Sequence, residues 1–115
     1  GKIINISSIF GVVSREKRSM YSTSKSALLG LTRASALDLS KHNVLVNSVS
    51  PGFVNTSLTR KILGKKGMKN IIKEIPIKRM ATTKDISNLI IFLSSNYNSY
   101  ITGQNFIIDG GVTCK

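Results

Sequence analysis

Residues 2–7 read KIINIS, residues 43–49 read NVLVNSV, and the long segment between them, 21–41, is rich in Ala, Leu and Ser. The two short runs of β-branched and apolar residues are typical of strands that are buried on both faces, which is the pattern of a parallel sheet. Residues 21–41 favour a helix. Two such strands joined through a helix need a crossover connection, so the sequence predicts an α/β fold with a parallel sheet.

The C-terminal part of the chain continues this alternation. Thr82 or Thr83 is a suitable N-cap for a helix that runs to about residue 95, because apolar residues recur there at helical spacing. Residues 104–108 read QNFII and are expected to form a third strand, which the Asp-Gly-Gly triplet at 109–111 ends. We therefore expect one more helix and one more strand of the same sheet.

The helix predicted over residues 21–41 carries apolar side chains on more than one face. They are Ala27, Leu28, Leu31, Ala34, Leu37 and Leu39. A helix with so wide an apolar surface is expected to pack on the sheet on one side and to be covered by something else on the other.

The segment 56–74 is basic and is interrupted by Gly64 and Gly67. Because glycine weakens a helix interior, we expect one or two short, mobile helices here. We interpret this segment as a lid over an opening.

Length and composition favour a single globular domain. With 115 residues, of which 41% are apolar, the chain has material for one modest core. No apolar run approaches the roughly 20 residues that cross a bilayer, so no membrane partner is expected. The chain shows no secretory signal, and Cys114 has no second cysteine for a disulfide or a zinc site. These features predict a cytoplasmic protein with an unreactive thiol and no metal.

The formal net charge of +12 is high for this length. The charge gathers at Arg15, Lys17 and Arg18 and at five lysines between residues 61 and 73. A nucleic-acid-binding domain is one reading of so basic a chain. The chain lacks the aromatic interleaving, zinc-finger spacing and basic-region heptads of known nucleic-acid modules, so we expect no nucleic-acid partner. Solvated surface charge explains the pattern more simply.

Tyr21 and Lys25 lie four residues apart at the start of the predicted long helix, which places their Cβ atoms about 6 Å apart on one face. A tyrosine phenol normally has a pKa near 10 and exchanges protons poorly at neutral pH, but a neighbouring ammonium group favours the phenolate. Such a pair could act as a general acid or a general base. By itself it is also a common surface pair.

Ser7 and Ser8 follow the first predicted strand directly. Ligands of open α/β sheets bind at the carboxyl ends of the strands, so a serine hydroxyl there could hydrogen-bond a substrate carbonyl. A serine at a strand end is more often an ordinary cap. Ser8 is a candidate functional residue because Tyr21 and Lys25 accompany it in the sequence.

Several motifs together resemble the short-chain dehydrogenase/reductase family. They are INISS, the thirteen-residue step from Ser8 to Tyr21, YSTSK, VNSVSPGFVNT and ITGQNFIIDGG. The set spans essentially the whole chain and is most similar to the 3-oxoacyl-(acyl-carrier-protein) reductase-like branch. The resemblance implies the C-terminal half of a Rossmann-type, doubly wound parallel sheet, and an enzyme that interconverts a carbonyl and a secondary alcohol with NAD or NADP.

The resemblance also implies roles for individual residues. Ser8 would bind and polarise the substrate oxygen, Tyr21 would transfer the proton, and Lys25 would assist Tyr21 and hold the nicotinamide ribose. The remaining expected cofactor-binding residues are Pro51, Gly52, Val54 and Thr56.

Other positions of the matched motifs receive structural roles. Asn47 and the Asp109–Gly110 pair are expected to support packing, and Arg79 is expected to form a salt bridge. His42 has no matching role and is expected to be an exposed loop residue.

The chain departs from the family pattern in one respect. None of its nine glycines belongs to a Gly-rich turn after a strand, the element that binds the cofactor pyrophosphate in such folds. Residues 1–115 are therefore expected to be the C-terminal catalytic part of one domain whose cofactor-binding N-terminal half is absent. Alone, this piece is expected to be inactive and poorly stable. A non-catalytic truncated remnant, or an interaction module of the same fold, is the alternative reading.

The resemblance and the charge distribution bear on partners. The substrate would be a small-molecule or carrier-bound carbonyl or alcohol, and the basic clusters suggest that it or its carrier is anionic. The family also implies a homo-oligomer, commonly a tetramer. NAD and NADP are not distinguished, because the residues that discriminate them would follow a strand that the chain does not contain.

Overall fold

The computed structural model describes residues 1–114. Three strands, β1 (Lys2–Ile6), β2 (Leu45–Pro51) and β3 (Asn105–Ile108), form one sheet in the order β1-β2-β3, and both pairings are parallel. The three predicted strands are confirmed. β2 begins and ends two residues later than predicted and includes Pro51. Proline is tolerated because it is the last residue of the strand.

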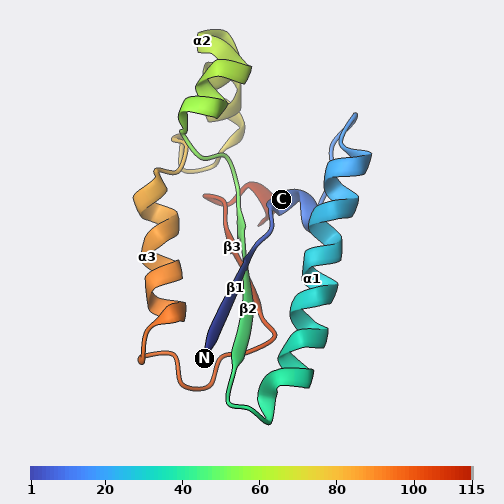
Figure 1. Cartoon of the computed structure of the whole chain (residues 1–115). Helices are drawn as coiled ribbons and strands as arrows, with labels where there is room; N and C mark the ends of the chain where they lie inside the picture. The colour runs from blue at the N-terminus through green and yellow to red at the C-terminus, as the bar shows by residue number, and fades with distance from the viewer. Residues whose placement is uncertain (115) are drawn as a thin grey trace.

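Helices cover both faces of the sheet (Figure 1). Helix α1 (Ser19–Ser40) packs on one face and α3 (Thr83–Ser94) on the other. Both predicted helices are confirmed, and Thr82 is the N-cap of α3. The first turn of α1 and the carboxyl ends of the strands lie at the same end of the molecule, where α2 (Ser57–Glu74) also begins.

The core lies in two places. Val49 on β2 packs with Ile86 and Leu93 of α3 between the sheet and that helix. A second cluster of Ile71, Ile75 and Met80 lies at the base of α2. The first cluster fixes α3 on the sheet, and the second fixes α2 beyond the sheet's end.

Helix α2 projects past the carboxyl ends of the strands (Figure 1). It is kinked at Gly64, whose φ of 61° and ψ of 179° are not helical. The predicted interruption at Gly64 is confirmed, but the one expected at Gly67 is wrong. A glycine costs only about 1 kcal/mol within a helix, so Gly67 weakens α2 without breaking it.

The two apolar faces predicted for α1 have different surroundings. Thr32 and Ala36 are buried on the face toward the sheet. Leu31 and Leu37 are exposed by 53% and 78%. The sheet therefore covers only part of the apolar surface that the sequence indicated.

The segment between β1 and α1 is only partly regular. It contains a short 3-10 helix, η1 (Ile9–Gly11), directly after Ser8, and α1 begins at Ser19 rather than at Tyr21. A second short turn, η2 (Val112–Cys114), follows β3. No helix among residues 1–114 is both long enough and apolar enough to cross a membrane.

The start of α3 holds the predicted salt bridge of Arg79. The Thr82 hydroxyl accepts a hydrogen bond from the Asp85 amide, and the Asp85 carboxylate accepts one from the Thr82 amide at 2.7 Å. Two guanidinium nitrogens of Arg79 donate to the same carboxylate at 2.8 and 3.3 Å. These bonds, that of Arg79 first and those of Thr82 next, hold the pKa of the Asp85 carboxyl well below its usual range.

This low pKa predicts a pH dependence of stability. In the unfolded chain Asp85 titrates near its ordinary pKa of about 4. Because the folded pKa is lower, the stabilisation that Asp85 provides is complete above its pKa in the unfolded chain. It is lost as the pH falls from there through the folded pKa. We expect the difference in unfolding free energy between wild type and Asp85→Asn to shrink between about pH 7 and about pH 3. Urea denaturation at both pH values measures it, and an unchanged difference would contradict the assignment.

Candidate active site

Ser7 and Ser8 lie at the carboxyl end of β1, and both are buried. The Ser7 hydroxyl donates to the backbone carbonyl of Lys25 at 2.9 Å, which ties the strand end to α1. The Ser8 hydroxyl accepts a hydrogen bond from the Phe10 amide at 3.2 Å and so caps η1. The cap that the sequence offered as the alternative role for Ser8 is thus present, and the hydroxyl hydrogen remains free to donate.

Tyr21 and Lys25 lie on the first turns of α1, as their spacing predicted. The Lys25 ammonium is 5.7 Å from the centroid of the Tyr21 ring and donates to the Ile6 carbonyl at 2.9 Å. An ammonium group has three N–H donors, so this bond leaves two for a ligand. Tyr21 is 43% exposed. The Lys25 ammonium therefore lies near both the Tyr21 ring and the end of β1.

Phe10 lies between Tyr21 and Phe53, and the sequence analysis missed it. Its ring centroid is 6.3 Å from that of Tyr21 and 6.2 Å from that of Phe53, with near-perpendicular rings in both pairs. Edge-to-face contacts of this kind are favourable and orient the rings. Because the Phe10 amide also donates to Ser8, one residue contacts both Ser8 and Tyr21. In the sequence, only the position of an aromatic residue two places after Ser8 could have indicated this role.

Gly11 allows η1 to approach α1 closely. A Cβ atom at this position would lie 2.8 Å from the Ser7 hydroxyl oxygen and 2.9 Å from the Lys25 carbonyl oxygen. Both distances are shorter than van der Waals contact. Only glycine fits here without displacing the elements that carry Ser8 and Lys25.

Four of the predicted cofactor-binding residues, Pro51, Gly52, Val54 and Thr56, lie at the end of β2 or shortly after it. A Cβ on Gly52 would be 2.8 Å from the Asp109 Cα, so Gly52 lets β2 and the end of β3 touch. Val54 pairs with Ala81 in a single parallel bridge, whose two hydrogen bonds use the amides of Asn55 and Ala81. The Val54 amide makes no hydrogen bond within residues 1–114. It is therefore a free donor near the strand ends.

Thr56 serves as the N-cap of α2. Its hydroxyl accepts a hydrogen bond from the Thr59 amide at 3.1 Å. The structure thus places Thr56 at the beginning of α2, while Pro51 and Gly52 lie beside the end of β3.

Basic residues of the loop before α1 contact α2 and the aromatic rings. The Arg15 guanidinium pairs with the Glu74 carboxylate at the last residue of α2 and lies 5.8 Å from the Phe53 ring centroid. The Arg18 guanidinium lies 6.0 Å from the Phe10 ring centroid. The loop between Ser8 and Tyr21 is therefore joined to the far end of the segment interpreted as a lid.

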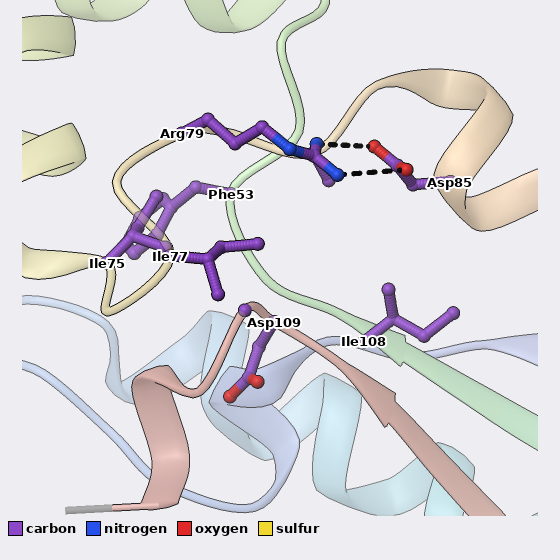
Figure 2. Close-up of a pocket in the computed structure, with 9 residues that line it drawn as sticks. Phe53, Ile75, Ile77, Arg79, Asp85, Ile108 and Asp109 are labelled. Carbon is purple, nitrogen blue, oxygen red and sulfur yellow. Dashed lines mark hydrogen bonds and ion pairs between the residues drawn. The ribbon is translucent and has the colours of Figure 1, made fainter.

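A cavity of about 220 Å³ lies between the loop after α2 and the end of β3. Figure 2 shows the Arg79–Asp85 pair on one side of it and the apolar side chains of Phe53, Ile75 and Ile77 on another. Ser8, Tyr21 and Lys25 do not line it. The cavity is separate from the candidate catalytic groups, and its lining residue Phe53 contacts Phe10 beside them.

Asp109, at the edge of this cavity, has a local structural task. Burial raises the pKa of its carboxyl, but hydrogen bonds from Thr113 and Gly111 outweigh that effect and hold the pKa below its usual value. Asn47 likewise binds backbone, at Ile101 and Gln104. His42 is exposed in the turn between α1 and β2.

Comparison with known proteins decides the family. Residues 1–113 match the family model described as Enoyl-(Acyl carrier protein) reductase. A crystal structure of a short chain dehydrogenase family protein from Francisella tularensis has a TM-score of 0.96 and 33% identity over 100% of this chain and 52% of its own. This chain belongs to the short-chain dehydrogenase/reductase family.

Curated short-chain dehydrogenase/reductase relatives align with nearly the whole chain. Trans-4-hydroxycyclohexanecarboxylate dehydrogenase from Sinomonas cyclohexanicum is 47% identical over 98% of this chain and 41% of its own length. The 3-oxoacyl-(acyl-carrier-protein) reductase FabG from Buchnera aphidicola is 41% identical over 97% of this chain and 46% of its own. The chain therefore spans less than half the length of these relatives.

Two solved structures with cofactors have the same fold. The 4-hydroxyisoleucine dehydrogenase complexed with NADH has a TM-score of 0.93 and 39% identity over 100% of this chain and 48% of its own. ElxO with NADP bound has a TM-score of 0.92 and 32% identity over 100% and 47%. The three parallel strands are thus the C-terminal half of a Rossmann-type sheet, as the sequence predicted.

Proposed function

We propose that the whole protein is an NAD- or NADP-dependent oxidoreductase that interconverts a carbonyl and a secondary alcohol, similar to 3-oxoacyl-(acyl-carrier-protein) reductases. The observation that carries the proposal is the joining of three groups at one strand end. Lys25 contacts both the Tyr21 ring and the Ile6 carbonyl, and Ser8 is buried two residues after Ile6.

Each of the three side chains has a distinct task in this proposal. The Ser8 hydroxyl donates to the substrate oxygen and polarises the carbonyl. The Tyr21 hydroxyl gives that oxygen a proton during reduction and takes it back during oxidation. The Lys25 ammonium stabilises the phenolate that remains on Tyr21.

The residues present fit a nicotinamide cofactor, which would supply or accept the hydride. Lys25 has two donors left for ribose hydroxyls, and the free Val54 amide suits a carboxamide oxygen. Pro51 and Gly52 would shape the surface beside the nicotinamide, and Thr56 would contact the carboxamide or pyrophosphate. Relatives bind NADH in one case and NADP in another, so both cofactors are proposed.

We further propose that residues 1–115 are the C-terminal catalytic part of one domain, whose other part binds most of the cofactor. The outer edge of β1 supports this, because no strand among residues 1–114 pairs with it. Ile3 and Ile6 of this strand are 41% and 45% exposed. Strands of parallel sheets are normally buried, so β1 is suited to further strands and helices.

The proposal is tested by assaying the whole protein with NADH and NADPH against a panel of ketones and 3-oxo thioesters. Loss of reduced-nicotinamide absorbance that depends on substrate is expected with at least one pair. The isolated 115-residue chain is expected to show none. Cofactor binding without turnover of any panel member would favour the non-catalytic alternative.

The basic clusters favour an anionic substrate or an acidic carrier. Arg15 and Arg18 lie over the rings of Phe53 and Phe10, so the loop that carries them borders the proposed site. A positive field there would speed the encounter with an anion and would weaken with salt.

This predicts that kcat/KM falls as ionic strength rises, because salt screens the attraction. Replacing Lys17 and Arg18 together with glutamine should remove most of that dependence, and Arg15 is left in place because the Glu74 carboxylate compensates its charge. Steady-state kinetics over a salt series measures it, with wild type as the reference. If the slope is the same in both proteins, these residues are merely solvated surface charge.

A cytoplasmic homo-oligomer, commonly a tetramer in this family, completes the proposal. Exposed apolar side chains on the outer surfaces of α1 and α3, including Leu37 and Ile91 at 78% and 64%, are suited to contacts between copies. The exposed, unpaired Cys114 suits a reducing compartment.

A further inference from the structure

Two arginines of the same loop have different partners. Arg15 pairs with the Glu74 carboxylate, so its charge is already compensated. Arg18 is exposed and forms no ion pair in the described part of the chain. The two residues therefore differ in their capacity to bind an incoming anion.

Arg18 shares an aromatic neighbour with Tyr21. Its guanidinium carbon is 6.0 Å from the Phe10 centroid, and the Tyr21 ring contacts the same Phe10 ring edge to face. Arg18 is the N-cap of α1, with backbone angles that are not helical, and precedes Tyr21 by three residues. One aromatic ring, that of Phe10, therefore links the Arg18 guanidinium to the Tyr21 side chain.

A guanidinium held on an aromatic ring is well prepared to receive a planar anion. Contact with the ring favours the cation and orients its plane. The N–H groups at the edge of that plane form a fork that matches the two oxygens of a carboxylate. One such fork matches the two oxygens of a single carboxylate, so it suits a small molecule that carries one.

We propose that Arg18 is a specificity-determining residue that binds the carboxylate of a small oxo acid or hydroxy acid whose carbonyl or alcohol carbon reacts beside Tyr21. This inference rests on the proposed function and names its substrate class. Arg15, held between Glu74 and Phe53, instead fixes the loop to α2.

The test compares an oxo acid with its methyl ester in the whole protein. The ester keeps the shape and the reacting carbonyl but has no charge. In Arg18→Gln, kcat/KM for the acid is expected to fall about 10–100-fold, the usual consequence of losing charge-assisted hydrogen bonds. The ester is expected to change by less than about 3-fold, because it has no carboxylate to lose. Arg18→Lys should retain part of the preference, because it keeps the charge without the fork.

Arg15→Gln is the matched control, since it neutralises an arginine three residues away. It is expected to affect acid and ester alike, through looser attachment of α2. An equal loss for acid and ester in Arg18→Gln, or an acid-selective loss in Arg15→Gln, would overturn the proposal.

Calorimetric titration of the acid distinguishes this inference from the proposed function. If the wild type turns over neither compound but binds the acid more tightly than Arg18→Gln does, the proposed reaction fails and the role of Arg18 stands. If both proteins bind the acid equally, the role of Arg18 fails. Thermal unfolding checks that each variant folds, and Arg18→Lys replaces Arg18→Gln if the latter does not.

Discussion

Replacing Tyr21 with phenylalanine in the whole protein should lower kcat by about 10²–10⁴-fold, the usual contribution of a positioned proton donor. The substitution removes only the hydroxyl. The edge-to-face contact with Phe10 remains, because it involves the ring alone. Steady-state rates with a saturating substrate measure the loss, and thermal unfolding should show little change because the side chain is 43% exposed.

The chain offers two matched controls for this substitution. Tyr97 and Tyr100 are 88% and 92% exposed and lie in the turn before β3, away from the first turn of α1. Their phenylalanine variants remove the same atom and should leave kcat within about 2-fold, as most exposed substitutions do. A similar rate for Tyr21→Phe and Tyr97→Phe would remove Tyr21 from the reaction.

Replacing Gly11 with alanine should destabilise the protein by about 1–3 kcal/mol, the usual cost of overpacking. The new Cβ would meet the Ser7 hydroxyl at 2.8 Å and the Lys25 carbonyl at 2.9 Å. The second of these atoms is backbone, which has little freedom to move. Ser7 precedes Ser8 in the chain, and the Lys25 backbone positions the Lys25 ammonium. We therefore expect kcat to fall together with the unfolding free energy.

Gly30→Ala provides a control of opposite sign. Gly30 lies within α1, and a Cβ there would meet nothing within 4 Å. Alanine in a helix interior is favoured over glycine by about 0.5–1 kcal/mol, so this variant should be more stable than wild type. Urea denaturation measures both variants. If the Gly11→Ala protein is as stable as the Gly30→Ala protein, η1 does not pack closely against α1.

The strands and long helices were predictable because their patterns are local. The β-branched runs at β1 and β2 and the apolar spacing of α3 each specify one element without distant information. The local pattern was misleading at Gly67. A glycine lowers the stability of a helix, but whether the helix breaks there depends on the packing around it. The two residues of α1 before Tyr21 had no sequence signal, since Arg18 makes no side-chain cap.

The proposed site was only partly predictable for a related reason. Spacing along a helix places Tyr21 beside Lys25, and this pair is where it was expected. The contacts of Phe10 with Phe53, and of Arg15 with Glu74, join residues that are 43 and 59 positions apart. The periodicity of the sequence does not predict such contacts, because they depend on where β2 and α2 come close to the loop before α1.

The uncovered edge of β1 has a consequence for handling the protein. A strand whose backbone N–H and C=O groups face solvent is a template for another strand, and the exposed Ile3 and Ile6 would add apolar contact to such pairing. Copies of these 115 residues, produced without the rest of a sheet, would therefore stack edge to edge and precipitate. The open edge that would accept further strands in the proposed whole domain makes these 115 residues by themselves prone to aggregation.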